Sequence, residues 1–105
     1  MKTIPSVYGK NGYAYNLLCR LKNVAIYEQK KKGKLFAYEV VKIRIRKGGV
    51  QFGKEAEAAE YLPSNEDWGT HGKTYSLSGQ SSVGSRMAAL AQMQVWVKES
   101  LQTAP

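Results

Sequence analysis

Residues 35–47 read LFAYEVVKIRIRK and carry the clearest β-strand pattern in the chain. Apolar residues recur at every second position, which is the period of a strand that buries one face. The apolar phase changes between Val40 and Val41. We therefore predict a β-bulge or a strong bend there, because one extra residue moves all later side chains to the other face.

Shorter alternating stretches lie on both sides of this strand. They predict further strands at residues 13–21, 24–29, 50–53 and 73–77. Turn-forming residues separate them at Lys22-Asn23, at the lysine-rich tip 30–34 and at Gly48-Gly49. Residues 54–61 are rich in Ala and Glu, which favours a short helix that Pro63 would end.

From Ser82 the apolar residues follow a helical period, and residues 82–101 are predicted to form one helix. Its apolar stripe contains Val83, Met87, Leu90, Val97 and Leu101, with Gln94 as a polar interruption. Trp96 lies about 140° from this stripe and Val95 about 120° from it. Either a loop of the same chain or a second chain would cover this reverse side. We predict a homodimer with Val95 and Trp96 at the contact.

The 105 residues fit one domain, and a hydrophobic content of 43% is typical of a folded protein. The strand pattern and the helical stripe each have one apolar face to bury. We therefore predict a single α+β domain: a strongly twisted antiparallel sheet of three to five strands, followed by one long C-terminal helix packed on it.

Several functional classes conflict with the composition. One cysteine, Cys19, forms no internal disulfide, and one histidine, His71, builds no usual zinc site. The acidic pair in loop 63–69, PSNEDWG, fits an ordered surface loop anchored by Trp68 better than a metal or acid–base pair. We expect no enzymatic activity, metal or cofactor.

The expected compartment is the cytoplasm. No secretory signal or lipidation motif is present, and no stretch approaches the roughly 18 apolar residues of a membrane span. The unpaired Cys19 suits a reducing environment. We expect an intracellular protein that does not bind a membrane.

Positive charge is concentrated in the first half of the chain. Residues 1–54 hold 13 of the 16 lysines and arginines but only two of the eight acidic residues, and the net charge is +8. Such a field attracts nucleic-acid phosphates, an anionic membrane or an acidic protein. The alternative is a merely solubilising surface, although such surfaces usually mix both signs.

Lys42, Arg44 and Arg46 are the main candidate binding residues. Their period of two places them on one strand face, roughly 7 Å apart, close to the phosphate spacing of a single strand. Lys47 and the tip residues Lys30, Lys31, Lys32 and Lys34 extend this basic patch. Tyrosines 13, 15, 27 and 38, with Tyr38 foremost, are candidates for stacking on bases. The solvent face of a half-buried strand, or a surface for an acidic protein, are the alternatives.

These observations predict a non-catalytic nucleic-acid-binding protein that prefers single strands, in particular single-stranded DNA. The alternative is an accessory protein of a phage or mobile element that binds and modulates a host protein. A comparison with and without nuclease would separate the two, because protein contacts survive the loss of nucleic acid.

Two resemblances bear on this prediction. The segment YLPSNEDWG at 61–69, followed by Lys73-Thr74-Tyr75 and a C-terminal helix, resembles small uncharacterised proteins carried by phages and mobile elements. The order of antiparallel strands and one long C-terminal helix is similar to the PC4-like and Whirly single-stranded-DNA-binding proteins. That similarity implies pairing through the helix and DNA binding on a basic curved sheet.

Overall fold

The computed structural model describes residues 1–51, 53–77 and 82–103. Within these ranges the chain forms nine strands, a short 3-10 helix and one α-helix. In chain order they are β1 (Val7–Lys10), β2 (Tyr13–Leu21), β3 (Val24–Lys31), β4 (Lys34–Lys42), β5 (Arg44–Arg46), β6 (Gly49–Gln51), β7 (Lys54–Ala56), β8 (Ala59–Tyr61), η1 (Asn65–Asp67), β9 (Gly72–Ser76) and α1 (Ser82–Thr103).

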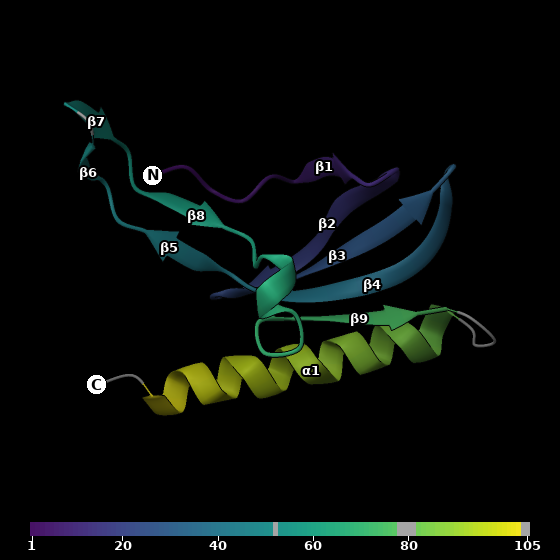
Figure 1. The fold of residues 1–105 in the computed structure, drawn as a ribbon. Coiled ribbons are helices and arrows are strands. Elements are labelled where there is room, and N and C mark those ends of the chain that lie inside the picture. Colours follow the sequence, from purple (N-terminus) through teal and green to yellow (C-terminus); the bar gives the residue numbers. More distant parts are fainter. Residues whose placement is uncertain (52, 78–81, 104–105) are drawn as a thin grey trace.

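The main sheet confirms the predicted α+β class. Five antiparallel strands lie in the order β1-β2-β3-β4-β9, and α1 runs along one face of the sheet (Figure 1). Two of the three predicted tight turns are also present, whereas the hairpin turn predicted at Gly48-Gly49 is absent, because β6 pairs with β7 and not with the strand before it. Lys32 and Gly33 take positive φ of 51° and 79° at the tip of the β3–β4 hairpin, and Lys22 takes 56° between β2 and β3. The sequence prediction missed β1, which pairs with β2 through a turn at Asn11-Gly12.

Strand β4 is covered on both faces. Tyr38 and Val40 pack with Met93 and Trp96 of α1, whereas Val41 belongs to a second core cluster on the opposite face. The phase change at Val40–Val41 therefore reflects two buried faces, and the bulge predicted there is absent from the register. The observed irregularities fall at Leu17/Cys19 and at Gln29/Lys30.

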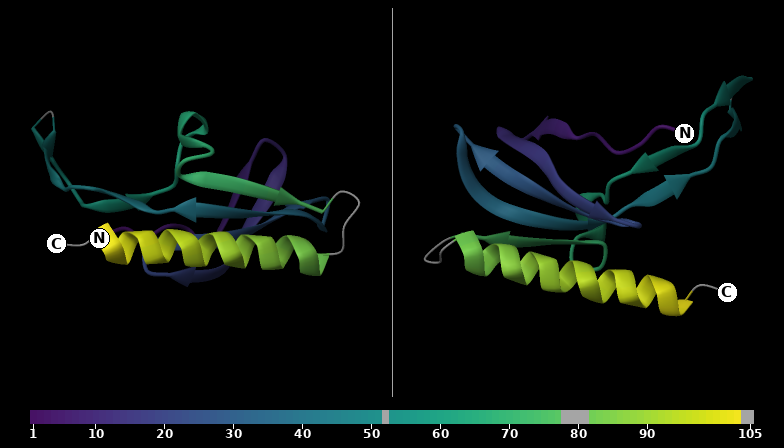
Figure 2. Two further views of the ribbon diagram at one scale, coloured as in Figure 1. Left: turned by 90° about the horizontal axis from the view of Figure 1, so that it is seen from below. Right: turned by 180° about the vertical axis from the view of Figure 1, so that it is seen from behind.

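The predicted strand 35–47 is in fact two strands in two different sheets. It ends at Lys42, and after Ile43 the chain leaves the main sheet as β5, which pairs with β8. Beyond them β6 pairs with β7, so residues 44–51 and 53–61 form a two-stranded arm. Figure 2 shows this arm extending beyond the sheet, at the end of the molecule where α1 ends.

The arm also corrects the predicted helix at 54–61, which is replaced by β7 and β8. Backbone pairing overrides the helix propensity of this Ala/Glu segment, because β8 is hydrogen-bonded to β5 on one side and to the N-terminal segment on the other. Lys2 N–H donates to Ala58 O at 3.0 Å, and Glu60 N–H donates to Lys2 O at 2.8 Å. The predicted strand 50–53 is observed as β6 (Gly49–Gln51), and Phe52 lies outside the described residues.

The helix is present where predicted, but a different face is buried. Its packed residues are Ser85, Ala89, Met93, Trp96 and Val97. Val83, Met87, Leu90 and Leu101 of the predicted core stripe are exposed, and Met87 reaches 65% exposure. The small Ser85 and Ala89 bring the helix axis close to the sheet, and Ser85 Oγ donates to Ser76 O at 2.9 Å. Of the predicted core stripe, only Val97 packs against the sheet.

Candidate nucleic-acid interface

The sheet face opposite α1 is concave and aromatic, and strand register builds it. Tyr27, Glu39 and Thr74 lie in one row across β3, β4 and β9, because Glu39 is the register partner of both others. The next row contains Tyr8, Tyr15 and Gln29 from β1, β2 and β3. The rings of Tyr8 and Tyr15 stack with centroids 4.6 Å apart.

Glu39 is a buried carboxylate in this face, with 9% of the residue exposed. Burial raises the pKa of Glu39, and a hydrogen bond from Thr74 and the charge of Lys10 oppose that rise. Burial and the negative charge of Glu39 in turn raise the pKa of Tyr8 and of Tyr15. The fold thus holds an acidic group among phenols that stay neutral at physiological pH.

Loop 63–69 places Trp68 beside Glu39. Trp68 Nε1 donates to Thr74 Oγ1 at 3.1 Å, and that hydroxyl donates to Glu39 Oε1 at 3.5 Å. The indole lies directly over Gly72, where a Cβ would come within 2.4 Å of the ring. Glycine at position 72 is therefore required by the close approach of Trp68, and the predicted anchoring of the loop by Trp68 is observed as this contact.

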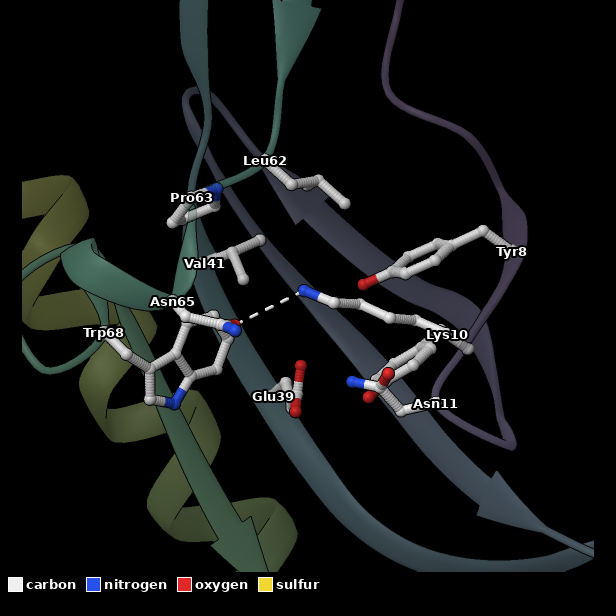
Figure 3. Close-up of a pocket in the computed structure, with 10 residues that line it drawn as sticks. Tyr8, Lys10, Asn11, Glu39, Val41, Leu62, Pro63, Asn65 and Trp68 are labelled. Carbon is white, nitrogen blue, oxygen red and sulfur yellow. Dashed lines mark hydrogen bonds between the residues drawn. The ribbon is translucent and has the colours of Figure 1, made fainter.

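A pocket of about 590 Å³ opens between these elements (Figure 3). It is lined by Tyr8, Lys10, Asn11, Tyr15, Glu39, Val41, Leu62, Pro63, Asn65 and Trp68. Lys10 crosses it, and Lys10 Nζ lies 3.4 Å from Asn65 Oδ1 of η1. The volume falls in the roughly 300–1,000 Å³ range of small-ligand sites.

An aromatic and basic surface continues from the pocket to the tips of the hairpins. Tyr13 packs against the same core cluster as Tyr8, and its ring contacts Phe36 with centroids 5.4 Å apart. Phe36 is 46% exposed, and Lys31 Nζ lies 5.4 Å from the centre of the Tyr13 ring. We call the tip cluster Tyr13, Phe36 and the lysines Lys30, Lys31, Lys32 and Lys34.

The predicted row Lys42, Arg44 and Arg46 does not form one continuous face. Lys42 Nζ lies over the Trp96 ring at 4.8 Å, on the helix side of the sheet. Arg44 belongs to the arm and forms an ion pair with Asp67 at 3.4 Å. Arg46 and Lys47 are exposed on the arm, where Ala59 is the register partner of Arg46. The same arm carries the exposed acidic residues Glu55 and Glu57. The break at Ile43 separates the three cations because it ends their common strand.

The predicted stacking role of Tyr38 is wrong. Tyr38 is fully buried under α1, and its hydroxyl accepts hydrogen bonds from Arg86 at 3.1 and 3.2 Å. Tyr27 is also fully buried and Tyr15 nearly so, so that of the four tyrosines only Tyr13 is open to a ligand at the tip. The alternation of apolar residues assigned these tyrosine rings to the two faces of the sheet, but it did not indicate that both faces are covered by other parts of the chain.

The predicted dimer contact at Trp96 is also wrong. Trp96 is 5% exposed and packs against the chain's own sheet, with Lys42 and Lys73 at its ring. Val95 is 48% exposed on another side of α1. The homodimer itself stays a prediction, without Trp96 as its contact.

No group of three or more potential metal ligands occurs among the described residues. Cys19 is half-buried against the helix-side core, and burial raises the pKa of its thiol. His71 lies in the turn before β9, where its Nδ1 is 3.0 Å from the Thr70 hydroxyl.

Sequence reasoning missed Lys10, Glu39 and Phe36 as parts of a site. One signal was available for Glu39, since a lone acidic residue between Tyr38 and Val40 in an otherwise apolar strand is unusual. No comparable signal linked it to Trp68 or Tyr8, because strand register and a loop contact bring them together.

Comparison with known families, curated proteins and solved structures yields no match for this chain. In the part of the chain that the structure describes, no helix is long and apolar enough to cross a membrane.

Proposed function

We propose that the protein binds single-stranded nucleic acid on its concave face, with the tip cluster as the first contact. One observation carries this proposal: the half-exposed Phe36 ring lies against Tyr13, and Lys31 Nζ lies 5.4 Å from the centre of the Tyr13 ring. Unpaired bases stack on such rings with little sequence preference, while ammonium groups contact the phosphates. The arm is a weaker candidate, because acidic residues accompany its cations.

The binding test uses fluorescence anisotropy with single- and double-stranded oligonucleotides at two salt concentrations. A Lys31/Lys32/Lys34→Ala variant should bind much more weakly and with a flatter salt dependence. The log–log slope should decrease by about 0.7 for each phosphate that the variant no longer neutralises. Phe36→Ala should weaken binding to single strands by about 1–3 kcal/mol and should leave double-strand binding nearly unchanged.

The matched control is Arg44/Arg46/Lys47→Ala, which removes the same number of positive charges, three, but from the arm. Equal losses of affinity in both triple variants would mean that net charge alone drives binding, and a larger loss in the arm variant would restore the row predicted from the sequence. Absence of binding by the wild type at low salt would refute the proposal.

A second function, binding to another protein, is favoured by the exposed stripe Val83, Met87, Leu90 and Leu101 of α1. Scattered apolar residues are normal on a surface, but these four share one side of the helix, and Val83, Met87 and Leu90 follow one another at helical spacing before the polar Gln94. A pull-down with nuclease treatment, comparing the wild type with a Met87/Leu90→Lys variant, tests it. Partners that survive nuclease and are absent with the variant would put this function first.

A further inference from the structure

The pocket contains one acidic side chain among its described lining residues, Glu39. An ionised carboxylate only accepts hydrogen bonds, and it has two oxygens that can accept side by side. Its protein partner is the Thr74 hydroxyl at 3.5 Å, which is the long limit of a hydrogen bond. Glu39 therefore retains most of its capacity to accept hydrogen bonds from a ligand.

Two aromatic rings lie on opposite sides of this carboxylate. Figure 3 shows Tyr8 on one side of the pocket and Trp68 on the other, with Glu39 between them. Both rings are held in place, Tyr8 by stacking on Tyr15 and Trp68 by its contact with Gly72 and its hydrogen bond to Thr74. Aromatic walls around a hydrogen-bonding floor suit a flat, aromatic ligand that carries N–H donors.

Among the nucleobases, guanine matches these features best. Its Watson–Crick edge carries two adjacent donors, N1–H and the N2 amino group, which fit the two oxygens of one carboxylate. Adenine and cytosine place an acceptor beside their amino group, and thymine or uracil places acceptors on both sides of its N–H. A free cation fits less well, because Lys10 already faces Glu39 and the protein carries a net charge of +8.

We propose that this pocket holds one guanine base, hydrogen-bonded to Glu39 between Tyr8 and Trp68. The inference rests on the proposed function, since the base would come from an unpaired nucleotide of a strand bound along the tip cluster. Lys10 is placed to contact a phosphate of that nucleotide, because its bond to Asn65 is weak at 3.4 Å and easily exchanged. A free guanine nucleotide offers the same edge and is the other source of this ligand.

The test compares labelled oligothymidines that carry a single central dG, dA or dC, in the same anisotropy assay. The wild type should bind the dG oligonucleotide at least about tenfold more tightly than the others, since hydrogen bonds to a charged group distinguish it. Glu39→Gln should abolish this preference while its circular dichroism spectrum stays native. The matched control is Glu28→Gln, which removes a glutamate from β3, where residue 28 pairs with Tyr38 on the other sheet face.

A second assay measures competition by free GMP and AMP, and it separates the two sources of the base. Competition by GMP alone would show that the pocket also binds the free nucleotide. Equal binding of all oligonucleotides, with affinity still dependent on the tip lysines, would overturn the pocket proposal and leave the proposed function standing. Saturable GMP binding that Glu39→Gln abolishes, without any oligonucleotide binding, would overturn the proposed function and leave the pocket as a site for guanine. Displacement by agmatine instead of GMP would assign the pocket to a cation and overturn the guanine proposal.

Discussion

Glu39 is a buried carboxylate whose charge opposes the stability of the fold. Its pKa is raised in the fold, so the folded state prefers the protonated carboxyl. Below the unfolded-state pKa both states are protonated and no cost arises. As the pH rises through the folded-state pKa, the buried charge destabilises the fold.

Glu39→Gln is therefore expected to increase the free energy of unfolding at pH 7, by about 0.5–2 kcal/mol. Urea denaturation of wild type and variant at neutral pH and near pH 4 measures this. The difference should shrink at the lower pH, because the wild-type carboxyl becomes protonated there. A variant that is less stable than the wild type at both pH values would contradict this account of Glu39.

Gly72 lies where the Trp68 ring leaves no room for a side chain. Gly72→Ala should displace Trp68 and destabilise the fold by about 1–3 kcal/mol, as overpacking does. Thermal unfolding and tryptophan fluorescence follow the two effects. Gly49→Ala is the control, since a Cβ there has no neighbour within 4 Å, and it should change neither quantity.

Among the elements, α1 shows why helical periodicity identifies a helix better than its packed face. Both the stripe through Met87 and the side through Trp96 contain enough apolar surface to pack. The side with Ser85 and Ala89 lies on the sheet, because small residues let the backbone of α1 approach β4 and leave room for the Trp96 ring.

Trp96→Ala is expected to destabilise the monomer by about 3–5 kcal/mol, the usual range for a buried large aromatic residue. Chemical denaturation measures this change. If Trp96 instead lay at a dimer contact, the variant would change sedimentation while unfolding with nearly the wild-type free energy.

For the exposed stripe of α1, in contrast to Trp96, we expect substitutions to affect self-association and not the stability of the fold. Val83, Met87 and Leu90 are separated by steps of four and three residues, and the polar Gln94 follows four residues later, a spacing that suits pairing of two helices. If the homodimer exists, Met87→Lys should weaken self-association in sedimentation velocity and leave the stability of the fold within about 0.5 kcal/mol. Unchanged association would exclude the stripe as the contact.

At the scale of the whole molecule, an ion pair connects the arm to the main sheet. Arg20 of β2 donates to Glu60 of β8 from Nη1 and Nη2, at 2.7 and 2.5 Å, and Glu60 also accepts from Ile4 N–H at 3.1 Å. The hydrogen bonds from Arg20 hold the pKa of Glu60 below its ordinary value. The contribution of Glu60 is therefore present above its unfolded-state pKa and is lost as the pH falls through the lower folded-state pKa.

Glu60→Gln should consequently loosen the arm at neutral pH and make little difference in acid. Hydrogen exchange of the β8 amides, compared between wild type and variant, reports this loosening directly. The control is Glu55→Gln on β7, an exposed residue of the same arm. Faster exchange in both variants would attribute the effect to the charge of the arm and not to the contact with Arg20.

The positive charge of the molecule is divided between two distant places. The tip cluster and the arm lie at opposite ends of the molecule (Figures 1 and 2), although the sequence suggested one basic patch from residue 30 to residue 47. The end of β4 at Lys42 divides that patch, because the chain leaves the main sheet after Ile43 and continues as the arm.

Local patterns in the sequence were sufficient to predict much of the secondary structure: strands at 13–21, 24–29 and 73–77, the turns at Lys22 and Lys32-Gly33, and the helix from Ser82. Alternation, turn chemistry and helical period are local signals, and in those segments no tertiary contact opposes them. The α+β class followed, because a one-faced helix and an apolar sheet must cover one another.

Tertiary contacts were needed to establish which surfaces are buried and which residues form the site. Periodicity indicates that side chains share a face, but not what covers that face. The sheet proved to be covered on both sides, so Tyr38 faces α1 and Glu39 faces the pocket. The pocket joins β1, β2, β4 and loop 63–69, which are brought together by register and by the contact of Trp68 with Gly72. Such long-range contacts depend on the whole chain, and no local pattern encodes them.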